Sequence, residues 1–203
     1  MPPPKVDQPW LFLIAGPNGS GKSSVYQDAD FETEGRSVWI VNPDLLTARI
    51  QRSENLDMSL ANIAAVNRIW SWLDASLSVH QTVGVETVLS TDKYRTMVQR
   101  AKSLGFAIWL IYVVLDSPER NVERVRLRVA KGGHDVPENK IRERYVRSLQ
   151  QFPWFLDQAD VALIYDNSKA QPKLIAEKRD GVVPLYENAL QAVVDAAKSI
   201  RTD

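Results

Sequence analysis

The sequence predicts an α/β fold in which a parallel sheet of about five strands is flanked by helices. Short apolar runs alternate along the chain with longer segments of helical periodicity, an order typical of parallel strands joined by crossover helices. The 203 residues are enough for one core covered on both faces by helices. We therefore expect a single domain that extends from residue 1 to residue 203.

The strand candidates are short apolar runs, each of which predicts a buried strand. The first, residues 10–15, reads Trp-Leu-Phe-Leu-Ile-Ala and leads directly into a glycine-rich turn. The others lie at residues 37–41, 83–87, 106–115 and 161–165.

The helix candidates fill the intervals between these runs and the chain after the last one. One opens at Lys22, and the others cover residues 59–77, 93–104, 118–131, 137 to about 151, and about 184 to 200. Two of these starts carry local signals. Ser117 before Pro118 is typical of an N-cap and a first turn, and Asp135 with Glu138 three residues later predicts a capping box.

The charge and cysteine content exclude several classes of function. Lys plus Arg number 25 and Asp plus Glu number 25, so no net charge draws the chain to nucleic acid or to an anionic membrane surface. The absence of cysteine excludes disulfides, thiolate metal sites and cysteine nucleophiles. The apolar run at residues 10–15 is too short for a membrane anchor or a signal peptide, and we expect a cytoplasmic protein.

A phosphate-binding loop follows the first strand. The fixed positions of the pattern G-x-x-x-x-G-K-S are all present in the segment formed by Gly16, Pro17, Asn18, Gly19, Ser20, Gly21, Lys22, Ser23 and Ser24. The backbone N–H groups at such a helix start converge on a polyphosphate. Lys22 is expected to reach the β- and γ-phosphates, and the Ser23 hydroxyl to ligate Mg²⁺. The loop predicts binding of a nucleoside triphosphate.

The carboxyl ends of the other strands carry the next candidates, because working groups of open α/β sheets gather there. Asp44 follows the second strand and either caps a helix that begins near Leu45 or accepts the proton of an attacking hydroxyl. Glu86 ends the third strand and is either a structural partner of an arginine or, with Thr87, a contact to a polar substrate.

Two further strand ends carry polar residues. Asp116 after the fourth strand is best explained by the geometry of helix entry at Ser117 and Pro118. Asp166 and Asn167 after the fifth strand receive no role.

Two basic helices meet at Gly132 and Gly133. Most of their charges are expected to form solvated faces, with Arg147 pointing outward and His134 incidental. The glycines are typical of a hinge, so residues 128–151 are interpreted as a lid that closes over the nucleotide and brings guanidinium groups to the phosphates. Arg128 is the first candidate and Arg144 the second. The basic residues of this region are Arg120, Arg124, Arg126, Arg128, Lys131, Lys140, Arg142, Arg144 and Arg147.

Together these motifs resemble the zeta-toxin family of P-loop kinases. The resemblance covers about residues 10–167 and rests on the phosphate loop, Asn42-Pro43-Asp44, Glu86-Thr87, and the stretches Gly132 to Pro137 and Arg144 to Leu149. It implies a P-loop kinase-like fold and transfer of a phosphoryl group from ATP or GTP with Mg²⁺. In toxins of this group the acceptor is a hydroxyl of a UDP-N-acetyl amino sugar such as UDP-N-acetylglucosamine, and its modification starves cell-wall synthesis.

The resemblance also implies residue roles. Lys22 and Ser23 would contact the phosphates and Mg²⁺, Asp44 would be the base, and Glu86 with Thr87 would bind the acceptor. Arg128 and Arg144 would be the lid arginines. If the protein is a toxin, a separate antitoxin protein would be its partner.

Members of the family tend to show Asp-x-Asp with a nearby Phe-Arg after the second strand, whereas this chain has Asn42-Pro43-Asp44-Leu45-Leu46. Asp44, which the resemblance makes the base, is retained, but the residues around it differ. Two alternatives therefore stay open, a kinase for another hydroxyl acceptor such as an antibiotic or a metabolite, and a nucleotide-binding switch or interaction module.

Overall fold

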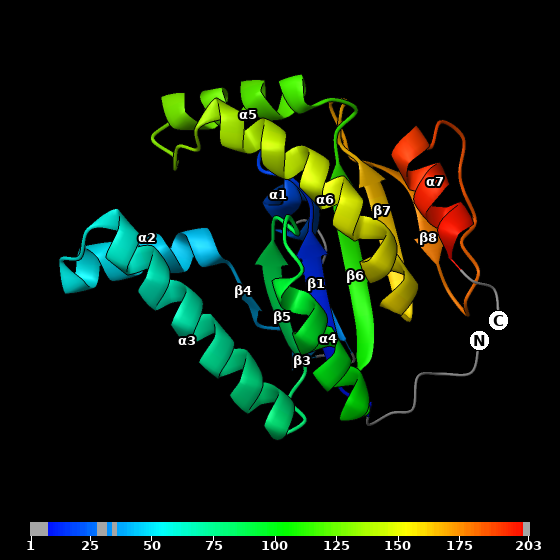
Figure 1. Cartoon of the computed structure of the whole chain (residues 1–203), viewed down its shortest axis with the longest axis horizontal. Helices are drawn as coiled ribbons and strands as arrows, with labels where there is room; N and C mark the ends of the chain where they lie inside the picture. Colours follow the sequence, from blue (N-terminus) through cyan, green and yellow to red (C-terminus); the bar gives the residue numbers. More distant parts are fainter. Residues whose placement is uncertain (1–7, 28–31, 34–35, 201–203) are drawn as a thin grey trace.

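The computed structural model describes residues 8–27, 32–33 and 36–200. Its main sheet has six strands in the order β4-β5-β1-β6-β7-β8, and only β8 runs antiparallel to its neighbour (Figure 1). These strands are β1 (Trp10–Ala15), β4 (Ile40–Val41), β5 (Val83–Thr87), β6 (Ala107–Val114), β7 (Val161–Asp166) and β8 (Lys173–Lys178). The short strands β2 (Glu32–Thr33) and β3 (Arg36–Ser37) pair separately.

Helices cover the two faces of the sheet unequally. They are α1 (Lys22–Gln27), α2 (Pro43–Glu54), α3 (Met58–Ser78), α4 (Lys93–Ser103), α5 (Pro118–Ala130), α6 (Glu138–Gln158) and α7 (Gln191–Ser199). The largest apolar cluster joins Leu11 and Leu13 of β1 to residues of α3, α4, α6 and α7. The alternate residue Ile14 faces the opposite side, where a smaller cluster includes Val25 of α1. The strands are therefore buried on both faces, as parallel strands usually are.

Strand register brings the candidate site together. Ala15 at the end of β1 lies beside Thr87 of β5 on one side and Tyr112 of β6 on the other. Since these strands are parallel, the chain segments that leave β1, β5 and β6 emerge at the same edge of the sheet.

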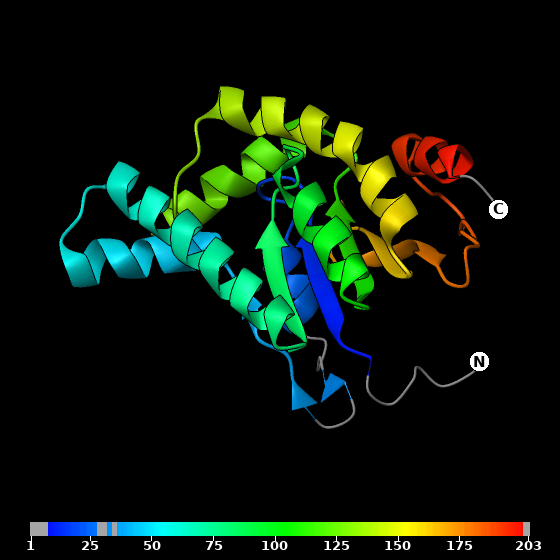
Figure 2. The same ribbon diagram turned by 60° about the horizontal axis from the view of Figure 1, so that its bottom comes forward.

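Two helical pairs flank the site (Figures 1 and 2). The pair α2 and α3 projects to one side of the sheet and packs through a small cluster that contains Ile50, Ala61 and Ala65. The pair α5 and α6 crosses the edge close to the loop that follows β1. None of the helices in the described part of the chain is both long and apolar enough to cross a membrane.

The fold prediction is confirmed as an α/β parallel sheet, with differences in detail. The sheet gains β8, an antiparallel strand that sequence analysis missed, and the second strand keeps only Ile40 and Val41 of the expected residues 37–41. The last helix begins at Gln191 rather than near residue 184, because the segment before it forms bridges to β8 and the following turn.

The predicted start of α6 near residue 137 is confirmed, whereas the capping box and the predicted end near residue 151 were wrong. The helix begins after Pro137 without a side-chain cap, so Asp135 forms no capping box. It continues through Pro153 to Gln158, although proline usually breaks a helix. Burial of Phe152 and Phe155 in the main core stabilises this last part and outweighs the lost backbone hydrogen bond.

Candidate active site

The loop after β1 folds tightly around its glycines. Gly19 and Gly21 have φ angles of +75° and +86°, in the left-handed region that favours glycine. A Cβ on Gly19 would lie 2.7 Å from the carbonyl oxygen of Asn121, and one on Gly21 would lie 2.3 Å from Nδ2 of Asn167. Side chains are therefore excluded at both positions by close neighbours as well as by conformation.

Two buried asparagines hold this loop from outside. Asn121 of α5 donates from Nδ2 to the carbonyl oxygen of Asn18 at 2.6 Å, and Asn167 after β7 donates from Nδ2 to that of Ser20 at 2.9 Å. Asn121 is completely buried and Asn167 is 5% exposed. Arg124 in turn donates to the carbonyl oxygen of Asn167 at 2.6 Å. The loop is thus tied to α5 and to the end of β7.

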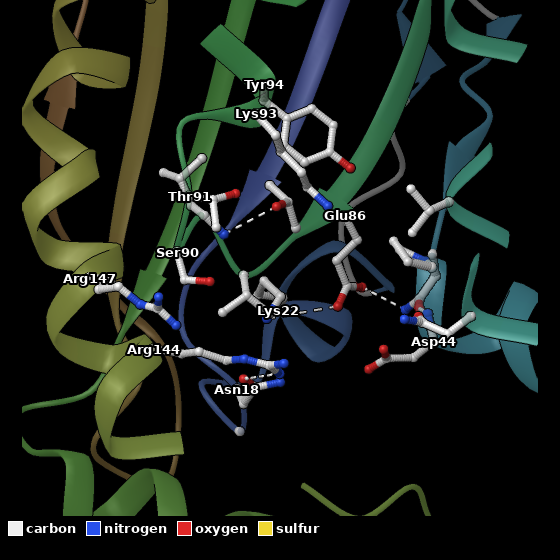
Figure 3. A pocket seen from close by; sticks show the side chains of 18 of the residues that line it. Asn18, Lys22, Asp44, Glu86, Ser90, Thr91, Lys93, Tyr94, Arg144 and Arg147 are labelled. Atoms are coloured by element: carbon white, nitrogen blue, oxygen red, sulfur yellow. Dashed lines mark hydrogen bonds and ion pairs between the residues drawn. The ribbon is translucent and has the colours of Figure 1, made fainter. Parts of the chain in front are cut away.

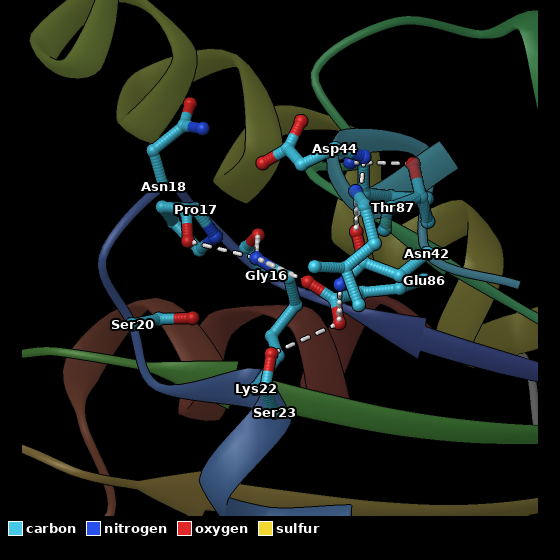
Figure 4. Close-up of polar contacts among 12 residues, drawn as sticks. Gly16, Pro17, Asn18, Ser20, Lys22, Ser23, Asn42, Asp44, Glu86 and Thr87 are labelled. Carbon is cyan, nitrogen blue, oxygen red and sulfur yellow. Dashed lines mark hydrogen bonds and ion pairs between the residues drawn. The ribbon is translucent and has the colours of Figure 1, made fainter. Parts of the chain in front are cut away.

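Lys22 lies inside the loop and is buried. Its Nζ donates to the carbonyl oxygens of Gly16 at 2.8 Å and Pro17 at 3.2 Å, and lies 3.9 Å from Oε1 of Glu86 (Figure 4). Burial lowers the pKa of Lys22, and the nearby carboxylates of Glu86 and Asp44 oppose that shift. The two carboxylates favour the charged ammonium, the form that can bind phosphate oxygens.

Glu86 accepts hydrogen bonds from two other candidate residues. Its Oε2 accepts from the Ser23 hydroxyl at 3.2 Å and from Nδ2 of Asn42 at 2.8 Å. The Ser23 hydroxyl and the Glu86 carboxylate are hard oxygen donors side by side, which fits Mg²⁺. The described residues contain no group of three or more histidine, aspartate or glutamate side chains that could hold a metal ion.

Asn42, not Asp44, caps α2. Oδ1 of Asn42 accepts from the backbone N–H groups of Asp44 at 2.9 Å and Leu45 at 3.2 Å. The capping explanation for Asp44 is therefore wrong, and its carboxylate points toward the phosphate loop (Figures 3 and 4).

Two cavities meet at the loop. One of about 490 Å³ is bordered by Ser23 and Ser24 at the start of α1, by Arg124 of α5 and by Lys131 just after α5. After its proposed role, we call it the nucleotide cavity. The other, of about 340 Å³, reaches from the loop to α2, α3, α4 and α6 (Figure 3). After its proposed role, we call it the acceptor cavity. The residues that border both are Gly19, Lys22, Glu86 and Arg128.

The acceptor cavity contains most of the other candidates. Asp44 and Thr87 border it, as does Arg144, whose Nη1 lies 3.4 Å from Oδ1 of Asn18. The Thr87 hydroxyl accepts from the backbone N–H of Leu89 at 3.1 Å. Arg147 also lines this cavity, so the expectation that it points outward was wrong.

Arg128 stands at the junction of the two cavities. Its Nη2 donates to the carbonyl oxygen of His134 at 2.7 Å, across the turn that contains Gly132 and Gly133. A Cβ on Gly133 would lie 2.5 Å from Cγ of Arg128. A side chain at position 133 would overlap the Arg128 side chain, so glycine is needed there for Arg128 to take this position.

The remaining strand ends have structural roles. The Ser117 side chain accepts from the backbone N–H of Arg120, and Asp116 forms an ion pair with Arg120 at 2.7 Å, which confirms helix-entry geometry. Arg126 and Arg142 form exposed ion pairs with Glu138.

A family model described as Zeta toxin matches residues 2–191. The chain belongs to the zeta toxin family. A relative from Haemophilus influenzae, described as an uncharacterized protein, is 27% identical over 140 residues, which make up 69% of this chain and 95% of the relative.

Solved structures agree in fold. The AvrRxo1-ORF1:-ORF2 structure with ATP superimposes with a TM-score of 0.71 at 16% identity, covering 98% of this chain and 66% of that one. The PezAT toxin-antitoxin system of Streptococcus pneumoniae gives a TM-score of 0.68 at 17% identity, covering 94% of this chain and 77% of that one. The family and the fold are those of nucleotide-dependent phosphotransferases.

The zeta toxin motifs named from the sequence thus lie together at one edge of the sheet. The sequence did not identify three other residues that contact the loop or line the acceptor cavity. Nothing in the sequence around Asn121 indicated that its side chain is buried against the loop, and Asn167 was assigned no role. Lys93 borders the acceptor cavity at the start of α4. A local pattern could not identify the two asparagines, because each contacts a segment distant in the sequence.

Proposed function

We propose that the protein transfers the γ-phosphoryl group of ATP or GTP to a hydroxyl of a UDP-N-acetyl amino sugar. The proposal rests on one observation: two cavities lie side by side and share Lys22, Glu86 and Arg128 in their linings. Both cavities border the phosphate loop, and only the acceptor cavity contains the carboxylate of Asp44. Two substrates placed in them would face each other across the residues that both cavities share.

The phosphate loop binds the nucleotide in this proposal. Lys22 exchanges its contacts to the carbonyl oxygens of Gly16 and Pro17 for oxygens of the β- and γ-phosphates. Ser23 and Glu86 would hold Mg²⁺, which when bound neutralises charge on the phosphates.

Asp44 is the proposed base. It borders the acceptor cavity only, and its carboxylate points toward the phosphate loop. The acceptor hydroxyl gives its proton to the Asp44 carboxylate while the hydroxyl oxygen forms a bond to the γ-phosphorus. At the same time the bond between the γ-phosphorus and the β,γ-bridging oxygen breaks. The products are a phosphorylated acceptor and a nucleoside diphosphate.

Residues 128–151 form the proposed lid. Arg128 and Arg144 border the acceptor cavity from α5 and α6, on either side of the turn at Gly132 and Gly133. Motion of this region toward bound nucleotide would bring both guanidinium groups to the charge that develops on the transferred phosphoryl group.

Two further parts of the proposal rest on the family. The UDP-amino sugar is the acceptor that the resemblance implies, and the protein would then act as a toxin. A separate antitoxin protein is the partner that the resemblance implies, and the name of the PezAT toxin-antitoxin system supports it.

The test is a mass-spectrometric assay with ATP, Mg²⁺ and a panel of UDP-amino sugars. We expect one phosphoryl group to be added to a UDP-sugar by the protein and not by Asp44→Asn. Phosphorylation that persists in Asp44→Asn would refute the base assignment. Slow loss of ATP without a modified sugar would refute the acceptor and favour another hydroxyl compound or a nucleotide switch.

A further inference from the structure

Asn42 lies between two carboxylates to which the proposed reaction assigns roles, Asp44 and Glu86. It follows β4, and the parallel register that pairs Val41 with Val85 places it beside Glu86 near the end of β5. Asp44 lies two residues further along the chain, in the first turn of α2. All three residues border the acceptor cavity. The side chain of residue 42 can therefore contact both the turn that carries Asp44 and the carboxylate shared by the two cavities.

The amide of Asn42 uses both of its polar atoms (Figure 4). Its Oδ1 accepts from the backbone N–H groups of Asp44 at 2.9 Å and Leu45 at 3.2 Å. Its Nδ2 donates to Oε2 of Glu86 at 2.8 Å. A rotated amide would turn its NH₂ group toward the two N–H groups and its oxygen toward the carboxylate. The three partners therefore fix one orientation of the amide.

The two polar atoms of the amide act on different parts of the site. The contacts of Oδ1 fix the first turn of α2, from which the exposed Asp44 carboxylate points toward the phosphate loop. The contact of Nδ2 orients Glu86, whose Oε2 also accepts from Ser23 at 3.2 Å and whose Oε1 lies 3.9 Å from Nζ of Lys22. A hydrogen bond to a charged acceptor is among the stronger ones in proteins, so this contact limits the orientations open to the Glu86 carboxylate.

Other residue types could perform one of these tasks at position 42 but not both. Serine and aspartate cap helices about as well as asparagine. The serine hydroxyl ends one atom short of the position of Nδ2, and an aspartate carboxylate has no proton to donate. An asparagine both accepts and donates, which fits the two sets of contacts.

We propose that Asn42 is a positioning residue for phosphoryl transfer, which through one amide couples the placement of Asp44 to that of Glu86. The inference rests on the proposed function for the roles of the two carboxylates. It goes further by assigning a role to residue 42 and by dividing that role into two parts. The cap places the base, and the donor orients the carboxylate that would hold Mg²⁺. Loss of a hydrogen bond that supports a metal-binding side chain typically lowers metal affinity or activity by about 10- to 100-fold.

The first test measures the Mg²⁺ dependence of nucleotide binding and needs no acceptor. The full chain is mixed with a fixed concentration of a fluorescent ATP analogue, and Mg²⁺ is titrated. Asn42→Ser and Asn42→Ala should each raise the Mg²⁺ concentration at half-saturation about tenfold or more, because both lack the donor to Glu86. Affinity for the analogue without Mg²⁺ should stay unchanged, whereas a general loosening of the site would weaken binding under both conditions.

Asp57→Ala is the matched control for loss of a helix cap. Asp57 caps α3 as Asn42 caps α2, since its Oδ1 accepts from the backbone N–H groups of residues 59 and 60 at 2.8 and 2.9 Å. It borders neither cavity, so the Mg²⁺ dependence of Asp57→Ala should equal that of the wild type. Circular dichroism establishes that the variants are folded, as expected for a half-buried residue and an exposed one at helix ends.

Two outcomes of this titration would overturn the inference. In one, the Asn42 variants require no more Mg²⁺ than the wild type. In the other, Asp57→Ala shifts the Mg²⁺ dependence as far as Asn42→Ala does, which would reduce Asn42 to a helix cap.

A kinetic arm tests the placement of Asp44. With UDP-N-acetylglucosamine as acceptor and saturating Mg²⁺, Asn42→Ala should have a lower kcat than Asn42→Ser, because only alanine removes the cap of α2. The KM for ATP should be the same in the two variants. Equal kcat values would refute the coupling to Asp44.

The two arms separate this inference from the proposed function. If no acceptor is phosphorylated but the Mg²⁺ dependence responds to Asn42 and not to Asp57, the orientation of Glu86 by Asn42 stands and the proposed reaction is wrong. If the wild type phosphorylates the sugar and the Asn42 variants match it in both arms, the phosphotransferase stands and the positioning role is refuted.

Discussion

The two asparagines that hold the phosphate loop allow a quantitative prediction, and Asn121→Ala is the sharper change. Asn121 is completely buried, and its amide donates to the carbonyl oxygen of Asn18 at 2.6 Å. Truncation to alanine leaves that oxygen without its donor. An unsatisfied buried polar group costs about 1–3 kcal/mol, so we expect the free energy of unfolding to fall by about 2 kcal/mol.

The same variant should bind nucleotide more weakly. The loop would lose its tie to α5 in the free protein, and binding would have to order it again. Urea denaturation measures the stability change, and equilibrium titration with a fluorescent ATP analogue measures the affinity. A chain of this length should show a decrease in Tm of roughly 4–8 °C.

Asn67→Ala is the matched control, because Asn67 is exposed on α3 and makes no recorded side-chain hydrogen bond in the described structure. Its free energy of unfolding should change by less than about 0.5 kcal/mol. The reasoning fails if Asn121→Ala is as stable as this control. An unchanged nucleotide affinity with lowered stability would limit the role of Asn121 to folding.

The remaining predictions concern the junction and the buried lysine. Arg128→Ala should reduce kcat far more than nucleotide affinity, because the guanidinium acts on charge that develops in the transition state; equal losses in kinetic and binding assays would contradict this. Gly133→Ala should lower the rate in the same assay, since its Cβ would lie 2.5 Å from Cγ of Arg128. Gly105→Ala, with φ +82° and open space around its Cβ, should cost only about 1 kcal/mol of stability and serves as its control. Burial lowers the pKa of Lys22, so the unfolded chain binds this proton more tightly and stability should rise with pH through the folded-state pKa, below the ordinary value of 10.5. The urea midpoint of Lys22→Met should lack this rise with pH. If the variant and the wild type have the same pH profile, the rise does not come from Lys22.

Local patterns predicted the elements that depend on local chemistry. The apolar run of β1 followed by Gly16 to Ser24 placed the phosphate loop, because the spacing of those residues encodes both the turn and the start of α1. Ser117 before Pro118 correctly predicted the entry to α5. The parallel direction of the strands from β4 to β7 was also predicted, from the alternation of apolar runs and helices.

Other predictions were wrong where tertiary packing outweighed a local sequence signal. We expected α6 to end near residue 151, but it continues through Pro153 to Gln158, where Phe152 and Phe155 are buried in the core. Asp135 suggested a capping box, yet the helix begins after Pro137. The strand β8 is mixed in composition, and its pairing with β7 could not be inferred from periodicity.

The sequence by itself determined the fold class, the phosphate loop and the strand-end candidates Asp44 and Glu86. Each of these depends on residues that are close together in the chain. Only the tertiary structure decided that Arg147 faces the acceptor cavity and that Asn121 and Asn167 hold the loop. The two asparagine contacts join residues 103 and 147 positions apart in the chain. Such pairs form when helices and strands pack against each other, and no short-range pattern records them.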